Sequence, residues 1–450
     1  MLKIVSRRLA RWSLVALIIV SAGSAIAQPS PIPVKNVAIY ADSGVVMAPA
    51  DGDPNIAVPI YSTWVWVPHS EWLRLMFDVV VLSGDPYQGT GSYIKMTSIF
   101  DGAHQTMDVR HLADWSYSSA VFNGEKVLVE LFAYPGTGGN RLSMTNVMAS
   151  DGPAAELQSI CGNRDDRVRS FDPRQGRLWP IGCTAWLIDR GDCTNRFLTA
   201  GHCISTSTTN AIVQFNVPLS TSDGTAVAPP PQDQFPVLNS SIQTSGSGGT
   251  GNDYAQFFTG ANSITGKHAR AHMGGTAYRL AGAAPTGSGQ TIRITGYGTT
   301  SPNTPSGGGL PRELSLVQKT HTGPYSGLSG TRIQYAVDTT GGNSGSPVVT
   351  EADGLAIGVH THGGCTTTGG SNSGTAVQHS GLQSYLANPR GICSPIGDVS
   401  GNGCVDDTDL ALILAAFGTS GALMREDLNS DGTIDDVDLA IVLENYGVGC

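Results

Sequence analysis

Three side chains that could form a nucleophilic triad occur along the chain in the order His202, Asp253 and Ser344, separated by 51 and 91 residues. A serine hydroxyl becomes a nucleophile when a histidine removes its proton, and a carboxylate holds that histidine in the required tautomer. Each residue alone has a common structural explanation in a turn or at a strand edge. Their joint occurrence in one block predicts acyl transfer through a covalent acyl-enzyme.

The residues next to each candidate suit these roles. His202 follows an apolar strand and an Ala-Gly turn, and Asp253 directly precedes an apolar run. Ser344 lies in the sequence Gly-Gly-Asn-Ser-Gly, whose glycines permit a sharp backbone bend. We expect the N–H groups of Gly342 and Ser344 to form an oxyanion hole, and no cofactor is needed for this chemistry.

A pattern of oxygen ligands occurs twice near the C-terminus. In residues 398–409, oxygen ligands fall at positions 1, 3, 5, 9 and 12, with glycine at position 6 and a backbone carbonyl at position 7. This spacing is typical of a calcium loop, and it recurs 29 residues later. Apolar helices are expected at 410–417 and 439–446. The predicted Ca²⁺ ligands are Asp398, Ser400, Asn402, Cys404, Asp406 and Asp409 in the first loop, and Asp427, Asn429, Asp431, Thr433, Asp435 and Asp438 in the second.

The first 27 residues carry four basic side chains, an apolar stretch and small residues at 25 and 27. This is the pattern of a secretory signal peptide. Without it the formal net charge of -10 falls to about -14, because four positive charges are removed; this argues against nucleic acid as a partner. No later segment has 18 uninterrupted apolar residues, so no membrane span is expected. We therefore expect a secreted, extracellular protein.

Three regions follow the predicted signal peptide, and the fold class is expected to be mostly β. Residues 28–158 contain short β-type runs and are predicted to form a β-sandwich. This sandwich is either a folding pro-segment removed near residue 158 or a retained binding module. Residues 159–392 are numerous enough for two six-stranded barrels, with a turn-rich surface loop at 222–236. Residues 393–450, with 11 acidic residues and one arginine, form a separate small helical domain.

Residues 160–390 resemble the trypsin-like serine peptidases, and most of all the bacterial glutamyl endopeptidases. The likeness lies in Asp165-Asp166-Arg167, the segments 183–188 and 337–340, the three motifs above and Gly358 to Gly364. Cys161 and the prolines at 229–231 are similar to lysyl endopeptidases instead. The resemblance implies a double β-barrel and serine endopeptidase activity. Asn343 stands where the animal digestive enzymes carry an aspartate, so activation should not depend on pairing that residue with a new N-terminal ammonium.

The resemblance implies two different substrate preferences. Thr339 and His360 match the pair with which glutamyl endopeptidases hold a substrate carboxylate, through a hydroxyl and an imidazolium. Asp338, however, lies six residues before Ser344, where enzymes that prefer Lys or Arg carry an acid. Glutamyl relatives also carry an aspartate there, turned away from the pocket. We favour cleavage after Glu or Asp, with Lys or Arg as the alternative, and expect His362 to be a loop residue.

The duplicated calcium loop and helix resemble a type I dockerin, which implies folding on Ca²⁺ and docking onto a cohesin module. Asp407-Thr408 and Asp436-Val437 differ from the usual recognition pairs. The tail is therefore either a cohesin-binding module that attaches the protein to a cell surface or multi-protein assembly, or a calcium-stabilised spacer. A catalytically idle cohesin-docking scaffold or adhesion protein is the rival from another class. A polysaccharide-degrading enzyme is disfavoured, because no paired catalytic carboxylates stand out.

Eight cysteines in an exported chain indicate disulfides. Cys183 is expected to pair with Cys203, which pins the turn beside His202. We expect a bond between Cys161 and Cys365, and another between Cys404 and Cys450. Cys193 and Cys393 are the two that remain. Since eight cysteines allow 105 pairings, the sequence alone does not determine this connectivity.

Overall fold

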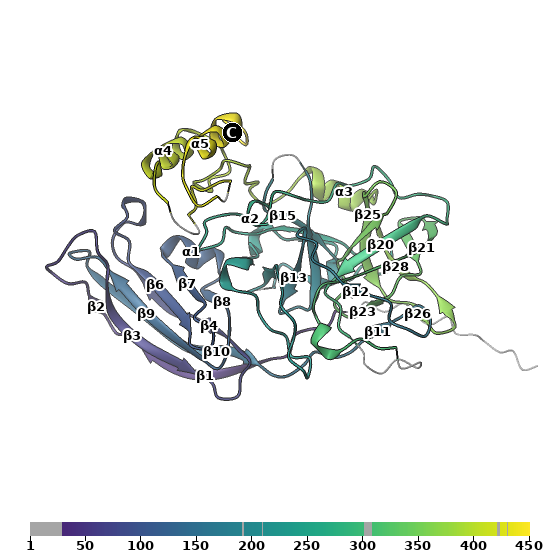
Figure 1. Ribbon diagram of the computed structural model, residues 1–450, viewed down its shortest axis with the longest axis horizontal. Helices are drawn as coiled ribbons and strands as arrows, with labels where there is room; N and C mark the ends of the chain where they lie inside the picture. Colours follow the sequence, from purple (N-terminus) through teal and green to yellow (C-terminus); the bar gives the residue numbers. More distant parts are fainter. Residues whose placement is uncertain (1–28, 191–192, 209, 301–307, 421–423, 430) are drawn as a thin grey trace, which may run out of the picture.

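The computed structural model describes residues 29–190, 193–208, 210–300, 308–420, 424–429 and 431–450 (Figure 1). The predicted signal peptide lies outside these residues. The described part of the chain is mostly β-structure, which confirms the predicted fold class. None of its helices has both the length and the apolar character needed to cross a membrane.

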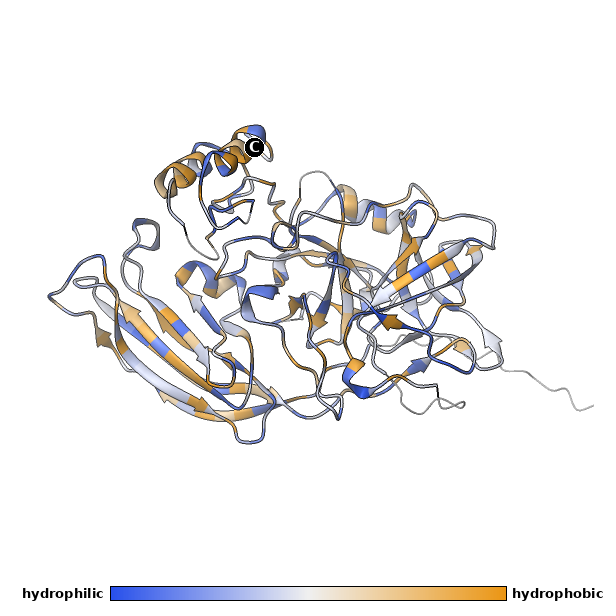
Figure 2. Ribbon diagram, viewed as in Figure 1, coloured by the Kyte–Doolittle hydropathy of each residue, from blue (hydrophilic) through white to orange (hydrophobic). Residues whose placement is uncertain are grey.

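Two antiparallel sheets face each other in the N-terminal region, with one hydrophobic core between them. The first has the order β1-β10-β4-β8, with β2 and β5 also paired to β10, and the second has the order β3-β9-β6-β7. Apolar and polar residues alternate along β6 and β9, as Figure 2 shows, so one face of each strand packs into the core. The strands are β1 (Val34–Asp42), β2 (Val46–Met47), β3 (Val58–Trp66), β4 (Trp72–Met76), β5 (Val79–Val81), β6 (Tyr93–Ser98), β7 (His104–Met107), β8 (Ser118–Asn123), β9 (Lys126–Ala133) and β10 (Gly139–Ser150), with helix α1 (Val109–Asp114) between β7 and β8.

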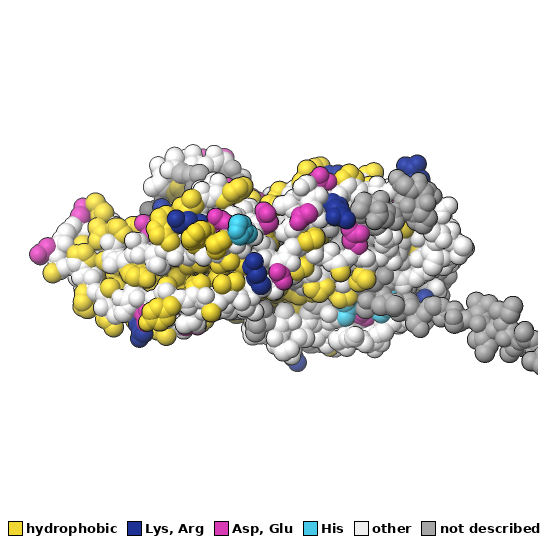
Figure 3. Space-filling model, turned by 90° about the horizontal axis from the view of Figure 1, so that it is seen from below, with side chains coloured by type: hydrophobic (Ala, Val, Ile, Leu, Met, Phe, Trp, Pro, Cys, Tyr) yellow, Lys and Arg dark blue, Asp and Glu magenta, His cyan; other side chains and the backbone are white. Residues whose placement is uncertain are grey.

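The outer surface of this region is partly apolar. Figure 3 shows hydrophobic side chains gathered over the N-terminal half of one face of the molecule. On edge strand β3, the side chains of Trp64 and Trp66 are 50% and 58% exposed.

A first seven-stranded sheet of the block after residue 159 has the order β17-β16-β13-β14-β15-β19-β18. Its core contains stacked Phe197 and Phe257, whose ring centroids lie 5.4 Å apart. The pairings of the described strands make this sheet a half-barrel, which together with the closed barrel described next agrees with the predicted double β-barrel. Its strands are β13 (Gln175–Trp179), β14 (Cys183–Leu187), β15 (Arg196–Thr199), β16 (Ile212–Gln214), β17 (Gln234–Pro236), β18 (Gln243–Thr244) and β19 (Ala255–Phe258), and α2 (Ala269–His272) follows.

A second seven-stranded sheet has the order β12-β21-β20-β24-β25-β28-β22, and an additional pairing of β21 with β22 closes six of these strands into a barrel. Helix α3 (Ser380–Ala387) follows the last strand of this barrel. The strands are β12 (Val168–Arg169), β20 (Thr291–Gly296), β21 (Lys319–Ser329), β22 (Arg332–Tyr335), β24 (Pro347–Thr350), β25 (Ala356–His362) and β28 (Asn372–Ala376); β11 (Gln158–Ser159) pairs with β23 (Thr339–Thr340), and β26 (Cys365–Thr366) with β27 (Gly369–Gly370).

The N-terminal sheets pack directly on the first seven-stranded sheet, hereafter the first barrel. Trp72 of β4 contacts Trp179 edge to face, with ring centroids 5.3 Å apart, and the buried guanidinium of Arg74 lies over the same indole. The side chain of Gln234 exchanges hydrogen bonds with the backbone of Val121, at 2.9 Å each. The predicted surface loop at 222–236 is therefore largely buried, because β8 covers it; the prediction of a surface loop was wrong.

The C-terminal tail contains two helices, α4 (Asp407–Ala416) and α5 (Asp436–Glu444). Each begins three residues before the predicted apolar run. Asp406 and Asp435 are the N-caps, and the side chains of Asp409 and Asp438 complete capping boxes, so the acidic residues of the loop start the helix themselves.

Candidate active site

His202 lies in a single 3-10 turn, Gly201–Cys203, at the end of β15. Its ring Nδ1 is 2.6 Å from a carboxylate oxygen of Asp253, and its backbone N–H donates to the other oxygen at 3.0 Å. The Asp253 side chain is fully buried, and only 5% of the His202 side chain is exposed. A carboxylate that accepts at Nδ1 leaves Nε2 free to take a proton.

Asp253 is held between the two barrels. Its backbone N–H donates to the hydroxyl of Thr375 at 3.0 Å, and that hydroxyl donates to the carbonyl of Asp253 at 2.9 Å. Thr375 belongs to β28 of the second barrel, whereas Asp253 lies two residues before β19 of the first seven-stranded sheet. His362 also approaches this carboxylate, with Nδ1 4.0 Å from Asp253 Oδ2. It ends β25 and is buried, so the expectation that His362 is a loop residue was wrong.

The loop that carries Ser344 is fixed to β14 of the first barrel. Thr184 donates its backbone N–H to the carbonyl of Ser344 at 2.8 Å and its hydroxyl to the carbonyl of Gly342 at 3.0 Å. Gly345 has a φ of +90°, and a Cβ there would lie 2.1 Å from the carbonyl oxygen of Thr184. Only glycine fits this approach. Thr184 follows Cys183, and the disulfide partner of Cys183 is Cys203, which follows His202. The strand that holds the Ser344 loop is therefore covalently linked to the turn that carries the histidine.

Two side-chain atoms of this cluster, Ser344 Oγ and His202 Nε2, are buried and make no hydrogen bond to the described part of the protein. Within the loop, the amides of Asn343, Gly345 and Ser346 all have protein acceptors. No described acceptor is found for the amides of Gly342 and Ser344. Buried polar groups are rarely left unpaired, and two free amides beside a free hydroxyl are the donors and the nucleophile that acyl transfer requires.

Arg167 supports the same loop, a role that the sequence did not reveal. Its buried guanidinium forms a bidentate ion pair with Asp165, with N–O distances of 2.7 and 2.8 Å. It also donates to Thr340 Oγ1 at 2.7 Å and to Asn343 Oδ1 at 3.0 Å. Burial raises the pKa of Asp165, but the hydrogen bonds and charge of Arg167 outweigh this and hold it below its ordinary value. The side chain of Asn343 is thus held by the buried guanidinium of Arg167.

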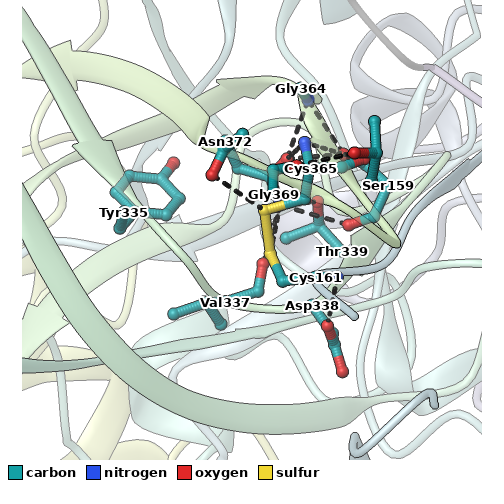
Figure 4. Close-up of a disulfide and its surroundings, with 12 residues drawn as sticks. Ser159, Cys161, Tyr335, Val337, Asp338, Thr339, Gly364, Cys365, Gly369 and Asn372 are labelled. Carbon is teal, nitrogen blue, oxygen red and sulfur yellow. Dashed lines mark hydrogen bonds between the residues drawn. A yellow bond between two sulfur atoms is a disulfide. The ribbon is translucent and has the colours of Figure 1, made fainter. Parts of the chain in front are cut away.

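The carboxylate of Asp338 accepts the backbone N–H groups of Cys161 at 2.7 Å and Asp166 at 2.9 Å. Figure 4 shows it pointing away from Tyr335, beside the Cys161–Cys365 disulfide. Burial raises its pKa, although these N–H groups oppose the shift. Both carboxylate oxygens of Asp338 therefore accept hydrogen bonds from the segment 161–166.

His360 is fully buried on β25, where its Nδ1 lies 2.7 Å from the hydroxyl of Tyr335. Burial, together with the nearby His362 and His202, lowers its pKa to about 3. The ring is therefore neutral near pH 7, not the imidazolium expected from the sequence. Burial raises the pKa of Tyr335 well above its ordinary value, so the phenol keeps its proton and can donate to Nδ1. The proton of His360 is then on Nε2, which has no partner among the described residues.

Thr339 and its surroundings are organised by Asn372, which sequence reasoning missed. The amide of Asn372 donates to the Thr339 hydroxyl at 2.9 Å and to the carbonyl of Val337 at 2.7 Å. Its carbonyl oxygen accepts from the hydroxyl of Ser159 and from the N–H of Cys365 (Figure 4). One amide thus joins β11, β23 and the disulfide.

Four disulfides are present, and no described cysteine is free: Cys161–Cys365, Cys183–Cys203, Cys193–Cys393 and Cys404–Cys450. These are the pairs set out from the sequence. Four disulfides are consistent with an extracellular protein.

The two acidic loops of the tail have the same internal geometry. Asp398 and Asp427 accept the N–H groups of Gly403 and Gly432, which have φ values of +90° and +88°. Asp409 and Asp438, both fully buried, accept the N–H groups of the residues three positions before them. Buried carboxylates around a glycine bend form an all-oxygen donor set that fits Ca²⁺.

Comparison with known proteins bears on this block. Residues 183–359, which include His202, Asp253 and Ser344, match the family model of the trypsin-like peptidase domain. A search among curated proteins found no match. Similar solved structures include a thermostable serine protease from an extremophilic microorganism (18% identity, TM-score 0.36, 48% of this chain and 95% of the other). A Glu endopeptidase in complex with MPD is also similar (21% identity, TM-score 0.35, 51% of this chain and 98% of the other). So is a mutant of human heparin binding protein (20% identity, TM-score 0.35, 51% of this chain and 98% of the other). Residues 183–359 are therefore similar to a trypsin-like peptidase domain.

Proposed function

We propose that this protein is a secreted serine endopeptidase in which Ser344, His202 and Asp253 form the catalytic triad. The observation that carries the proposal is the buried His202–Asp253 pair, 2.6 Å apart, beside a loop whose serine hydroxyl and two amides have no partner among the described residues. The match to the trypsin-like peptidase domain supports the same activity. An idle scaffold would not need these unpaired groups.

The proposed reaction follows from these atoms. Ser344 Oγ attacks the substrate carbonyl while His202 Nε2 takes its proton, and the amides of Gly342 and Ser344 stabilise the oxyanion. His202 then protonates the leaving amine as the carbon–nitrogen bond breaks, which leaves an acyl-serine. Water, deprotonated by His202, attacks this ester, and the bond to Ser344 Oγ breaks as His202 returns the proton to that oxygen, which releases the acid. Asp253 stabilises the imidazolium throughout.

We further propose that cleavage follows Glu or Asp. The Nε2–H of His360 on β25 has no partner among the described residues, and the hydroxyl of Thr339 accepts from Asn372 on the adjacent strand β28. Asp338, the residue that favoured Lys or Arg, has both oxygens occupied by backbone N–H groups and therefore gives no support to that alternative. Because His360 is neutral in the free protein, a substrate carboxylate would bind best when a proton is taken up onto the imidazole.

This mechanism predicts how specificity depends on pH. For matched peptides with Glu or Gln before the cut, the ratio of kcat/KM values should favour Glu at pH 5 and fall by up to about tenfold per pH unit above the pKa of the bound His360. The sign follows because the free-protein pKa is about 3 and a carboxylate raises it, so the extra proton is lost as the pH increases.

The matched control is His360→Asn, for which the ratio should be small and independent of pH. Peptides released from a denatured protein mixture, identified by mass spectrometry, would give the preferred residue independently. A preference for Lys or Arg, or a pH-independent Glu preference in the wild type, would contradict the proposed pocket.

We propose that the tail binds two Ca²⁺ ions and serves as a docking module for a cohesin, with a calcium-stabilised spacer as the alternative. The matching geometry of the two loops supports the ions. Calorimetric titration of the full chain should show two calcium sites in the wild type and one in Asp438→Asn. Asp436→Asn, an exposed neighbour outside the predicted ligand set, should keep two. A full chain that takes up no calcium would contradict the ion sites.

Cohesin docking is tested separately, by retention on immobilised cohesins with and without chelator. Calcium-dependent retention would support the docking role. Absence of retention under every condition would leave the spacer.

A further inference from the structure

Residues 29–32, hereafter the strap, run in an extended conformation along the chain that leads into β14. The N–H of Ser30 donates to the carbonyl of Gly182 at 3.0 Å, and the N–H of Ile32 donates to the carbonyl of Pro180 at 2.9 Å. Alternate residues thus pair with alternate carbonyls, as when a peptide adds to the edge of a sheet. Ser30 is fully buried and Ile32 is 3% exposed, so the strap is packed firmly in place.

The strap lies between the two halves of the proposed catalytic machinery. Gly182 precedes Cys183, whose disulfide leads to the residue next to His202. On its other side Ser30 faces the loop of Ser344, because a Cβ on Gly341 would lie 2.7 Å from Ser30 Oγ. A Cβ on Gly182 would lie 1.7 Å from the carbonyl oxygen of Ser30, so only glycine allows this contact.

A second segment covers the same loop. The N–H of Gly341 donates to the carbonyl of Leu157 at 2.7 Å, and the hydroxyl of Ser30 donates to the carbonyl of Ala155 at 2.6 Å. The connector between β10 and β11 therefore holds the strap against the loop. The side chain of Ser344 has no exposed surface in this arrangement.

A bound substrate would need the space that the strap occupies. Its carbonyl carbon must meet Ser344 Oγ, and its leaving nitrogen must meet His202 Nε2. The residues after the cut therefore begin between the His202 turn and the Gly341–Gly342 backbone. Ser30 lies against the second border at Gly341, and on its other side it bonds to Gly182, whose neighbour Cys183 is linked to the His202 turn by the disulfide to Cys203. An extended peptide and the strap would compete for the same edge.

We propose that the strap is an autoinhibitory segment, which binds as the leaving part of a substrate would and keeps the full chain in a low-activity state. The proposal rests on the proposed peptidase function. It gives the N-terminal sandwich a defined part in regulation, since the sandwich anchors the strap through β1. Proteolysis that frees residues 29–32 would then activate the enzyme.

The test uses point variants of the full chain. Ile32→Asp places a charge in a buried position, and Ser30→Pro removes the N–H that bonds to Gly182. The matched control is Pro31→Asp, because Pro31 is exposed and donates no hydrogen bond. The substrate is a fluorogenic peptide with Glu before the cut and four residues after it. Active sites are counted by exhaustive labelling with a fluorophosphonate, which is small enough not to need the strap edge.

If the strap is closed in nine molecules of ten or more, opening it raises kcat/KM per labelled site by at least about tenfold. We expect this increase in Ile32→Asp and Ser30→Pro and not in Pro31→Asp. If all three variants kept the wild-type kcat/KM, with equal labelling, the autoinhibitory role would be overturned and the peptidase function would remain supported. Failure of every form to be labelled would instead contradict the peptidase function.

Discussion

Replacement of Ser344 by alanine is expected to lower kcat by about 10⁶-fold, because it removes the nucleophile. His202 then has no hydroxyl from which to take a proton. The residual rate would come from the oxyanion hole and substrate binding, which act without the hydroxyl. Progress curves with the extended Glu peptide would measure the loss. The fold should be retained, since Ser344 Oγ makes no hydrogen bond to the described residues.

Ser346 offers a close control. It lies two residues further along the same loop, is fully buried, and its hydroxyl also lacks a hydrogen-bond partner in the described structure. Ser346→Ala should keep kcat within about tenfold of the wild type, as expected for a serine outside the triad. Loss of activity in Ser346→Ala with full activity in Ser344→Ala would show that the nucleophile has been assigned to the wrong residue.

The second large effect is expected at Arg167. Arg167→Met would leave the carboxylate of Asp165 buried without its cation, which destabilises a protein by about 3–5 kcal/mol. Thr340 and Asn343 would lose their donor as well, so the amides of Gly342 and Ser344 should be less well placed. Because the loss of one oxyanion donor costs about 10²–10³ in kcat, a decrease of this order is expected at temperatures where the variant stays folded.

Urea unfolding would measure the stability and initial rates would measure kcat. Arg164→Met is the control, since the Arg164 side chain is 72% exposed and should contribute within about 0.5 kcal/mol. The double variant Asp165→Asn with Arg167→Met removes the buried charge along with its partner and should recover much of the stability but not kcat. If Arg167→Met kept the wild-type stability and kcat, the proposed support of the loop would be wrong.

The candidate site was predictable where its residues lie in short local motifs. His202, Asp253 and Ser344 each have neighbours that suggest a turn or a strand end, and the structure brings His202 and Asp253 together. Arg167 and Asn372 could not be assigned in this way. Their partners lie at distant positions, such as Asn343 for Arg167 and Ser159 for Asn372, so their roles depend on tertiary pairing. The Asp-Asp-Arg motif was the one sequence signal near Arg167.

The fold shows the same division. Strands β6 and β9 show a clear alternation of apolar and polar residues in the sequence, whereas Trp64 and Trp66 face solvent and obscure this alternation in β3. The segment 222–236 has the composition of a surface loop, and its burial depends on a neighbouring sheet that local sequence does not encode. The expected imidazolium of His360 was also wrong, because burial beside His362 and His202 lowers its pKa, and this burial depends on the tertiary fold.

The triad is tested most directly by labelling the full chain with a fluorophosphonate and locating the adduct by mass spectrometry. Formation of the adduct requires a hydroxyl activated by its histidine, so we predict a single adduct on the peptide that contains Ser344, and its loss in His202→Ala. An unlabelled protein, or an adduct on a different residue, would contradict the account.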